Sequence, residues 1–271
     1  MFGPLLSKPR EAENVAAWFE RIAATILNGA ELLVAGEPYR FAEIEFYYHA
    51  DGHADPFTHC DPIQNTSGQW YLHRTGTGYR SGSFKGIDLT FGEGSFGGIL
   101  IRSVVAPDGS IVNGPSLCVD RLIAKTGVES VAQLDETIGV RDAWDPGQMQ
   151  LKPAEPTDRP IHQTARVGLS LKRAQTLVDP ERYVLKPYRY LTEPRKIAKG
   201  KPHLVLALHA ENTPIDEIHR QTGSPRKSIG RYIDDFNTGT AESDFAPYHG
   251  TDLSTRDLCR LHGLWHTKYG H

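Results

Sequence analysis

Two carboxylates and a phenol stand at alternating positions early in the chain. In the segment Phe41–Tyr48, one apolar residue separates Glu43 from Glu45 and another separates Glu45 from Tyr47. Strict alternation with aromatic and branched residues predicts a β-strand, whose successive side chains point to opposite faces. One face would then meet a core, and the other would carry the acids and the ring. Such a strand can form one wall of a site, although a solvated edge strand would show the same alternation.

The loop that follows, residues 49–59, is dense in histidine and acid. A metal-dependent nuclease site could use four of its side chains: Asp51, His53, Asp55 and His59. Loop composition explains these residues equally well. Near the C-terminus, Cys259, His262 and His266 have ligand-like spacing but no clear fourth zinc ligand. We therefore predict helix packing there, and neither a metal nor another cofactor in the protein.

The whole chain has the composition of a globular protein. Its 271 residues, 39% of them hydrophobic, suit one large domain or one domain plus a small module. No apolar run is long enough to span a bilayer, and the N-terminus lacks the apolar core of a signal peptide. The three cysteines are odd in number and far apart, which favours a reducing compartment. We expect a monomer without a membrane partner, in the cytoplasm (the bacterial nucleoid) or in a nucleus.

Charge is distributed unevenly along the chain. Residues 159–235 hold 15 Lys and Arg against 8 Asp and Glu, which is +7, while the whole chain carries −3 and the remainder therefore −10. A basic third within an acidic chain is typical of a protein with one face directed at a polyanion. A solvated basic surface would give the same count.

The elements that must position the early strand are mixed helices and strands, which predicts an α+β fold. A helix is expected over residues 9–29, and an irregular connection over residues 141–164. Further strands and one more helix are expected at Glu31–Val34, Arg40–Tyr48, Trp70–His73, Phe84–Phe91, Gly98–Val105, Leu117–Lys125 (the helix), Arg166–Leu169 and Lys186–Leu191.

A different pattern of apolar residues, with helical spacing, begins near Pro202. After a predicted helix over residues 203–211, Thr213 and Pro214 have the residue types of a helix cap and first helical position. Apolar residues then recur on both sides of Gly223, with Ile215 expected to face inward, as in a helix-turn-helix. The second helix would expose Arg226, Lys227 and Arg231.

A three-helix packing module would share this spacing, but the basic exposed face favours DNA contact. The tail from Leu253 to Trp265 resembles a truncated copy of the same pattern, with Gly263 at its turn.

Several separated stretches resemble, in the right order, the alkyladenine (3-methyladenine) DNA glycosylase family. The resemblance covers about residues 3–195 and leaves out the helix-turn-helix region. The stretches that carry it are Asn28–Leu32, Arg40–Tyr47, Ala54–His59, Ser67–His73, Gly98–Val104, Asn113–Cys118, Arg166–Gly168 and Lys186–Tyr190.

The resemblance implies roles for particular residues. Glu45 matches the family's catalytic carboxylate, which activates the water that attacks the sugar C1′, and Arg102 matches the arginine beside that water. Tyr47 and His59 match groups that stack on a flipped-out base. His73 falls on a third stacking position, usually tyrosine, and Asp88 falls where the family has an asparagine beside the base.

The resemblance also implies a fold and an activity. The fold that it implies for residues 1–200 is a curved, mostly antiparallel sheet with flanking helices. The helix-turn-helix pattern, which lies outside the resemblance, adds the expectation of a helical DNA-binding module in residues 201–271. The activity would be that of a monofunctional DNA glycosylase, since no lysine stands as an obvious Schiff-base nucleophile. The alternative is a non-catalytic DNA-binding or regulatory protein on the same scaffold. Both imply double-stranded DNA as the partner.

The chain departs from the family pattern in two places. The segment Arg74–Ser83 is longer and richer in glycine than the family's short hairpin, and Tyr79 is its candidate for insertion into the duplex. Asp88 and His73 give the base pocket a carboxylate and an imidazole in place of an amide and a phenol. These exchanges predict a substrate other than 3-methyladenine.

Overall fold

The computed structural model describes residues 2–8 and 14–270, and the chain divides into two compact units. Unit 1 comprises the described residues up to His53, together with Thr58–Ile161 and Tyr190–Thr192. Unit 2 comprises Ala54–Phe57, His162–Arg189 and the residues from Glu193 onward. The second unit thus takes in residues 54–57, 162–189 and 193–200, all of which precede the expected boundary.

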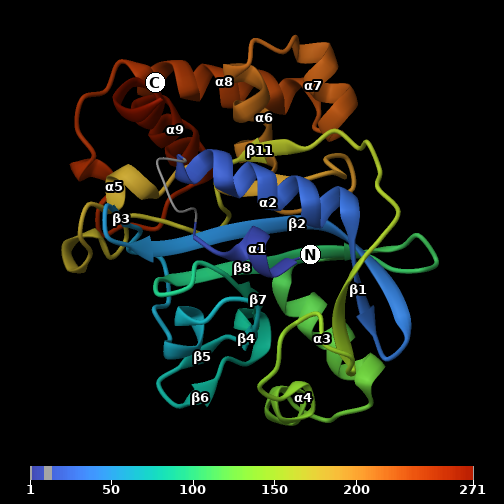
Figure 1. The fold of residues 1–271 in the computed structure, drawn as a ribbon. Helices are drawn as coiled ribbons and strands as arrows, with labels where there is room; N and C mark the ends of the chain where they lie inside the picture. Colours follow the sequence, from blue (N-terminus) through green and yellow to red (C-terminus); the bar gives the residue numbers. More distant parts are fainter. Residues whose placement is uncertain (1, 9–13, 271) are drawn as a thin grey trace. The chain divides into compact units, whose positions relative to one another are not determined.

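Unit 1 is built on an antiparallel sheet, and the α+β class expected from the sequence is confirmed. Its strands follow in the order β10 (Met149–Pro153), β1 (Ala30–Val34), β2 (Glu37–Ala50), β8 (Phe96–Val105), β7 (Ile87–Thr90) and β4 (Trp70–Leu72). The long strands β2 and β8 run side by side through the middle of this sheet (Figure 1).

Shorter elements surround the sheet of unit 1. Three more strands join it, with β9 (Ile111–Asn113) beside β8, and β3 (His53–Ala54) and β12 (Arg189–Leu191) beside β2. The other elements of the unit are α1 (Phe2–Leu6), α2 (Val15–Gly29), η1 (Pro62–Asn65), β5 (Arg74–Thr75), β6 (Gly78–Tyr79), η2 (Gly82–Phe84), α3 (Pro115–Thr126) and α4 (Val131–Ile138).

Helix α2 lies against one face of the sheet (Figure 1), and aromatic rings form the contact. The helix begins after Asn14, whose side chain accepts a hydrogen bond from the Ala16 N–H, and the expected residues 9–13 lie outside the described part. Phe19 of α2 stacks on Phe46 of β2 with ring centroids 4.5 Å apart. Because alternate strand residues face opposite ways, this burial turns the acids of β2 to the other face.

Unit 2 is mainly helical. Its elements are β11 (His162–Thr164), η3 (Ala174–Thr176), α5 (Pro180–Tyr183), α6 (Lys201–Ala210), α7 (Ile215–Thr222), α8 (Arg226–Thr240), η4 (Ala246–Tyr248) and α9 (Thr255–Tyr269). Helices α7 and α8 are joined at Gly223, which ends α7 in the left-handed conformation (φ 70°). The glycine turn expected from the sequence is therefore present.

Where α8 packs against α9, glycine allows a close approach of the two helices and does not form a turn. The tail is one continuous helix, so the prediction of a turn at Gly263 was wrong. A Cβ at Gly263 would lie 2.0 Å from the carbonyl oxygen of Phe236, and one at Gly239 would lie 1.9 Å from that of Arg260. The two helix backbones approach so closely that only glycine fits at these crossings.

Several sequence expectations about individual elements were also wrong. Residues 166–169 do not form a strand, and the Arg166 side chain is buried in an ion pair with Asp55. The connection expected to be irregular contains β10 and β11. Thr213 does not cap α7, since Pro214 stands at that position without a side-chain bond, and Ile215 is 43% exposed.

Within the ranges that the structure describes, no helix combines the length and the apolar character that crossing a membrane requires.

Candidate active site

Arg102 bridges two buried carboxylates on the polar face of the sheet. Its Nε donates to Glu43 Oε1 at 2.9 Å, and its Nη1 donates to Glu45 Oε2 at 3.2 Å. Tyr47 Oη donates to the same Glu45 oxygen at 2.9 Å, and Ser103 Oγ donates to Glu43 Oε2 at 2.6 Å. Glu45 is 0% exposed, while Tyr47 is partly exposed. The structure thus brings Glu45 and Arg102 together, and Glu43 completes the cluster.

An irregularity in strand pairing aims these side chains. Glu43 stands opposite Ser103, and the next residue, Ile44, stands opposite Ile101, so Arg102 is the extra residue on β8. A bulge of this kind turns a side chain that would otherwise point to the other face. It lets Arg102 and its neighbour Ser103 both reach the carboxylate of Glu43.

Strand register places a second polar group beside this cluster. Leu100 of β8 stands opposite Glu45 of β2 on one side and opposite Asp88 of β7 on the other. Asp88 in turn stands opposite Tyr71 of β4. Residues directly opposite each other in a sheet share a face, so the carboxylate of Glu45, that of Asp88 and the Tyr71 ring project from the same face.

The second group is a network around Asp88. Its Oδ1 lies 2.7 Å from His73 Nε2, and its Oδ2 accepts a hydrogen bond from Gln64 Nε2 at 3.3 Å. The His59 ring lies 4.5 Å from that of His73, and its Nδ1 lies 3.3 Å from Tyr71 Oη. Gln64 holds one Asp88 oxygen while the other contacts His73, so the fixed carboxylate orients the His73 ring. The sequence expectation had placed Asp88 beside a base.

Two of these partners were missed at the sequence level. Tyr71 stands two residues before His73, so strand alternation could have assigned both to one face. Gln64 belongs to the short helix η1 in the loop before β4, and its spacing along the chain gives no signal of its position.

Glycines make the room that this network occupies. A Cβ at Gly98 would lie 2.3 Å from Asp88 Oδ2 and 2.7 Å from Gln64 Nε2. A Cβ at Gly86 would lie 2.5 Å from His73 Nδ1. These residues therefore leave the face of the sheet open where polar side chains fold over it.

Burial and charge set the protonation of the site. Burial lowers the pKa of the Arg102 guanidinium, but the carboxylates of Glu45 and Glu43 outweigh it and raise the pKa above its ordinary value. Burial also lowers the pKa of His59 to about 4, an effect that the His73 imidazole reinforces and Asp88 opposes. At neutral pH the site thus holds a fixed cation between two acids and a neutral imidazole at its edge.

The segment expected to insert into DNA, Arg74–Ser83, holds Tyr79, and a second aromatic residue, Phe84, follows it directly. Tyr79 Oη donates to Asp135 Oδ2 at 2.5 Å, and Arg74 Nη2 bonds to the same oxygen at 2.8 Å. Phe84, expected to begin a strand, lies in η2 with 75% of its surface exposed. A hydrogen bond from Ser116 Oγ to Gly82 O ties η2 to α3, so Phe84 is presented on an anchored loop.

Two of the residues weighed as possible metal ligands have other partners. His53 Nδ1 lies 2.9 Å from Tyr48 O, and Asp55 pairs with Arg166 within unit 2, where both side chains are fully buried. Over residues 2–8 and 14–270, no group of three or more His, Cys, Asp or Glu could hold a metal ion. The histidines and acids of residues 49–59 thus serve separate contacts.

The basic residues assigned to DNA contact lie on the first turns of α8. Arg226, Lys227 and Arg231 are all exposed. Arg226 Nε pairs with Asp216 Oδ1 of α7 at 2.6 Å. Their charges are therefore available on the surface of unit 2.

Comparison with known proteins gives one relative of the chain. No protein-family model matches it. A protein of Acanthamoeba polyphaga mimivirus, described as "Uncharacterized protein L759", is 32% identical over 186 residues, which cover 62% of this chain and 86% of that protein. The chain belongs to the same family as this mimivirus protein.

Proposed function

We propose that the protein is a monofunctional DNA glycosylase that hydrolyses the N-glycosidic bond of a modified base flipped out of double-stranded DNA. The observation that carries the proposal is the shared face of Glu45 and Asp88 across β2, β8 and β7. A carboxylate paired with arginine lies beside a wall of imidazole and phenol rings. Hydrolysis through an oxocarbenium-like sugar needs the carboxylate, and holding a planar base needs the rings.

In the proposed reaction, Glu45 takes a proton from water as the water oxygen attacks the sugar C1′. The base departs with the electron pair of the glycosidic bond. The negative charge of Glu45 stabilises the developing cation at the sugar. Because Glu45 is fully buried under the Tyr47 hydroxyl, the substrate must displace the Tyr47 ring, which is partly exposed and able to stack on the base.

DNA would be held by features of each unit. In unit 1, the exposed Phe84 ring supplies an aromatic surface for a base step opened by flipping. In unit 2, the exposed cations of α8 match the phosphate backbone, and α7, Gly223 and α8 have the order of a helix-turn-helix. We propose that both contribute to binding one duplex by a monomer.

Single-turnover excision tests the proposal. Duplex oligonucleotides would each carry one modified base (hypoxanthine, 1,N6-ethenoadenine or 5-hydroxymethylcytosine), and alkali would reveal abasic sites. We expect excision of at least one base by the wild type. Loss of the general base in Glu45→Gln should slow the rate by about 10²- to 10⁴-fold. Glu37→Gln, on the same strand but exposed in a pair with Lys125, is the matched control and should retain the rate.

Two results would overturn the proposal. Equal inactivity of the wild type and Glu45→Gln on every substrate would remove the enzymatic function as tested. Equal activity of the two would remove Glu45 from the mechanism. Unfolding curves of the variants separate a lost base from a lost fold.

The second candidate function is DNA binding without catalysis, and the burial of Glu45 favours it. A carboxylate facing the DNA backbone would weaken binding by repulsion, which is why its presence pointed to an enzyme at the sequence level. With Glu45 0% exposed and paired with Arg102, that repulsion is absent. Tight binding to abasic-site DNA by the wild type, together with failure to excise any base, is the result that this candidate predicts.

A further inference from the structure

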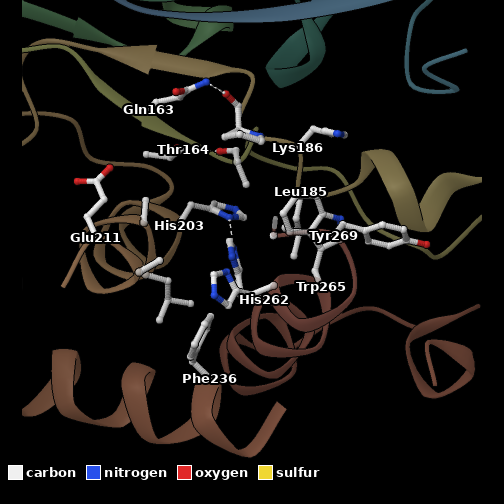
Figure 2. Close-up of a pocket in the computed structure, with 17 residues that line it drawn as sticks. Gln163, Thr164, Leu185, Lys186, His203, Glu211, Phe236, His262, Trp265 and Tyr269 are labelled. Carbon is white, nitrogen blue, oxygen red and sulfur yellow. Dashed lines mark hydrogen bonds between the residues drawn. The ribbon is translucent and has the colours of Figure 1, made fainter. Parts of the chain in front are cut away.

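Unit 2 contains a cavity of about 470 Å³ that the proposed chemistry does not use (Figure 2). Its walls come from residues 163–165, residues 185–187 and helices α6, α8 and α9. Cavities of roughly 300–1,000 Å³ are typical of small-molecule sites. The volume therefore suits one ligand of nucleotide size.

A pair of histidines lies at the centre of this cavity (Figure 2). His203 Nδ1 of α6 lies 2.8 Å from His262 Nε2 of α9, so one imidazole donates to the other. Burial lowers the pKa of His262 to about 3, so this ring is neutral at physiological pH. Neutral imidazoles can donate or accept, which suits the mixed donor and acceptor edge of a nucleobase.

Aromatic side chains supply flat surfaces around the pair. Phe236 of α8 lies 5.7 Å from the ring of His266, and Trp265 lies 5.8 Å from that of Tyr269. The Trp265 indole is fixed by a hydrogen bond from its Nε1 to Glu181 O at 3.0 Å. Rings held in this way can stack on a planar heterocycle with little loss of freedom.

Lys186 adds a positive charge to the wall. In Figure 2 it lies on the opposite side of the His203–His262 pair from Glu211. Burial lowers the pKa of Lys186, and the nearby cation of Arg182 lowers it further. An ammonium that has lost water and has a cationic neighbour gains from an anionic ligand group.

We propose that this cavity binds a 5′-mononucleotide, with the base among the aromatic and imidazole rings and the phosphate at Lys186. The ring surfaces, the hydrogen-bonded imidazole pair and the ammonium each match one part of that ligand. The proposal stands apart from the glycosylase function, because every residue that lines the cavity belongs to unit 2.

Isothermal titration of the full-length protein tests the site, with adenosine 5′-monophosphate and adenosine as the probes. AMP should bind more tightly than adenosine. Lys186→Gln should weaken AMP about tenfold, the loss of one charge-assisted contact, and change adenosine by less than about twofold. Ala207→Phe fills the cavity from its partly exposed wall on α6 and should abolish both. Ala241→Phe, on the surface after α8, is the matched control and should change neither.

Three results would overturn the proposal. The first is no binding of AMP, GMP, CMP or UMP at millimolar concentration. The second is AMP binding that Ala207→Phe leaves intact, which would place the ligand elsewhere. The third is an equal loss of affinity for AMP and for adenosine in Lys186→Gln, which would show that Lys186 does not contact the phosphate. Excision assays on the same variants report on unit 1 separately, so failure of either proposal is recognisable.

Discussion

The polar face of unit 1 and the cavity of unit 2 both bury polar side chains, but they differ in charge. In unit 1, Arg102 lies between the carboxylates of Glu43 and Glu45, and all three are almost fully buried. In unit 2, His203 and His262 form a hydrogen bond beside a cavity of about 470 Å³. The polar face of unit 1 is closed by its own ion pairs, whereas the side chains of unit 2 border an open cavity.

The difference follows from the cost of removing each group from water. A buried charge is tolerated only when other groups of the protein pair with it, so the acids of unit 1 are enclosed by their own partners. A hydrogen-bonded imidazole pair, in which burial keeps His262 neutral, carries a smaller penalty and can border an open space. The proposed reaction of unit 1 therefore requires the site to open, whereas the proposed binding to the unit 2 cavity does not.

Removing the central cation should produce the largest effect. Arg102→Met leaves two carboxylates buried with no cation between them, and we expect a loss of about 3–5 kcal/mol in the free energy of unfolding. Urea denaturation at pH 7 measures it. The triple variant Glu43→Gln, Glu45→Gln, Arg102→Met removes the acids as well and should recover most of the loss. A triple variant no more stable than Arg102→Met would show that the arginine acts through packing alone.

Closing the space over Gly98 should have the next largest effect. In Gly98→Ala the new methyl group overlaps the carboxylate of Asp88 and the amide of Gln64, and we expect destabilisation of about 2–3 kcal/mol. Gly29→Ala, where a Cβ meets nothing within 4 Å, is the matched control in the same unit. Equal stability of the two variants in urea would contradict the packing of Asp88 over Gly98.

Breaking the imidazole pair of unit 2 should cost less. His262→Phe removes the hydrogen-bond partner of His203 Nδ1 but removes no charge, because burial keeps His262 neutral, and we expect a loss of about 1–2 kcal/mol. The same urea experiment measures it. A loss as large as that of Arg102→Met would remove the contrast between the two sites.

Strand alternation was enough to predict much of the polar face. It assigned Glu45 and Tyr47 to one side of β2, and the apolar partners of α2 to the other. It did not predict that Arg102 points to this face, because the bulge that turns it depends on pairing with a distant strand. The place of Arg102 came from the resemblance to a family.

Long-range packing decided the features that the sequence did not reveal. Gly263 was predicted to be a turn residue because glycine often ends helices. It lies instead inside α9, where the close approach of α8 leaves no room for a Cβ. Arg166 was placed in a strand, but it lies outside any strand and its side chain makes a buried ion pair with the distant Asp55. The cavity of unit 2 arises from residues on segments far apart in the chain, and periodicity carries no signal of such a space.

Acidification should reveal the smallest difference between the two regions, about one pH unit in the point at which each stops losing stability. The pKa of His59 is about 4 in the folded protein, against an ordinary value of 6.5, so between these pH values the unfolded chain binds a proton that the native state excludes. Stability contributed by neutral His59 is complete above pH 6.5 and is lost as the pH falls towards 4. His59→Gln should therefore show a shallower decline of the urea midpoint over this window than the wild type.

The pKa of His262 in the folded protein is about 3, so the stability that neutral His262 contributes continues to fall for one more pH unit. His262→Gln should accordingly flatten the decline down to pH 3, while His59→Gln has no further effect below pH 4. Midpoints measured in steps from pH 7 to pH 3 distinguish the two variants. If both decline in parallel with the wild type throughout, the two imidazoles are exposed to protons in the native state. The closed site of unit 1 would then admit water without a substrate.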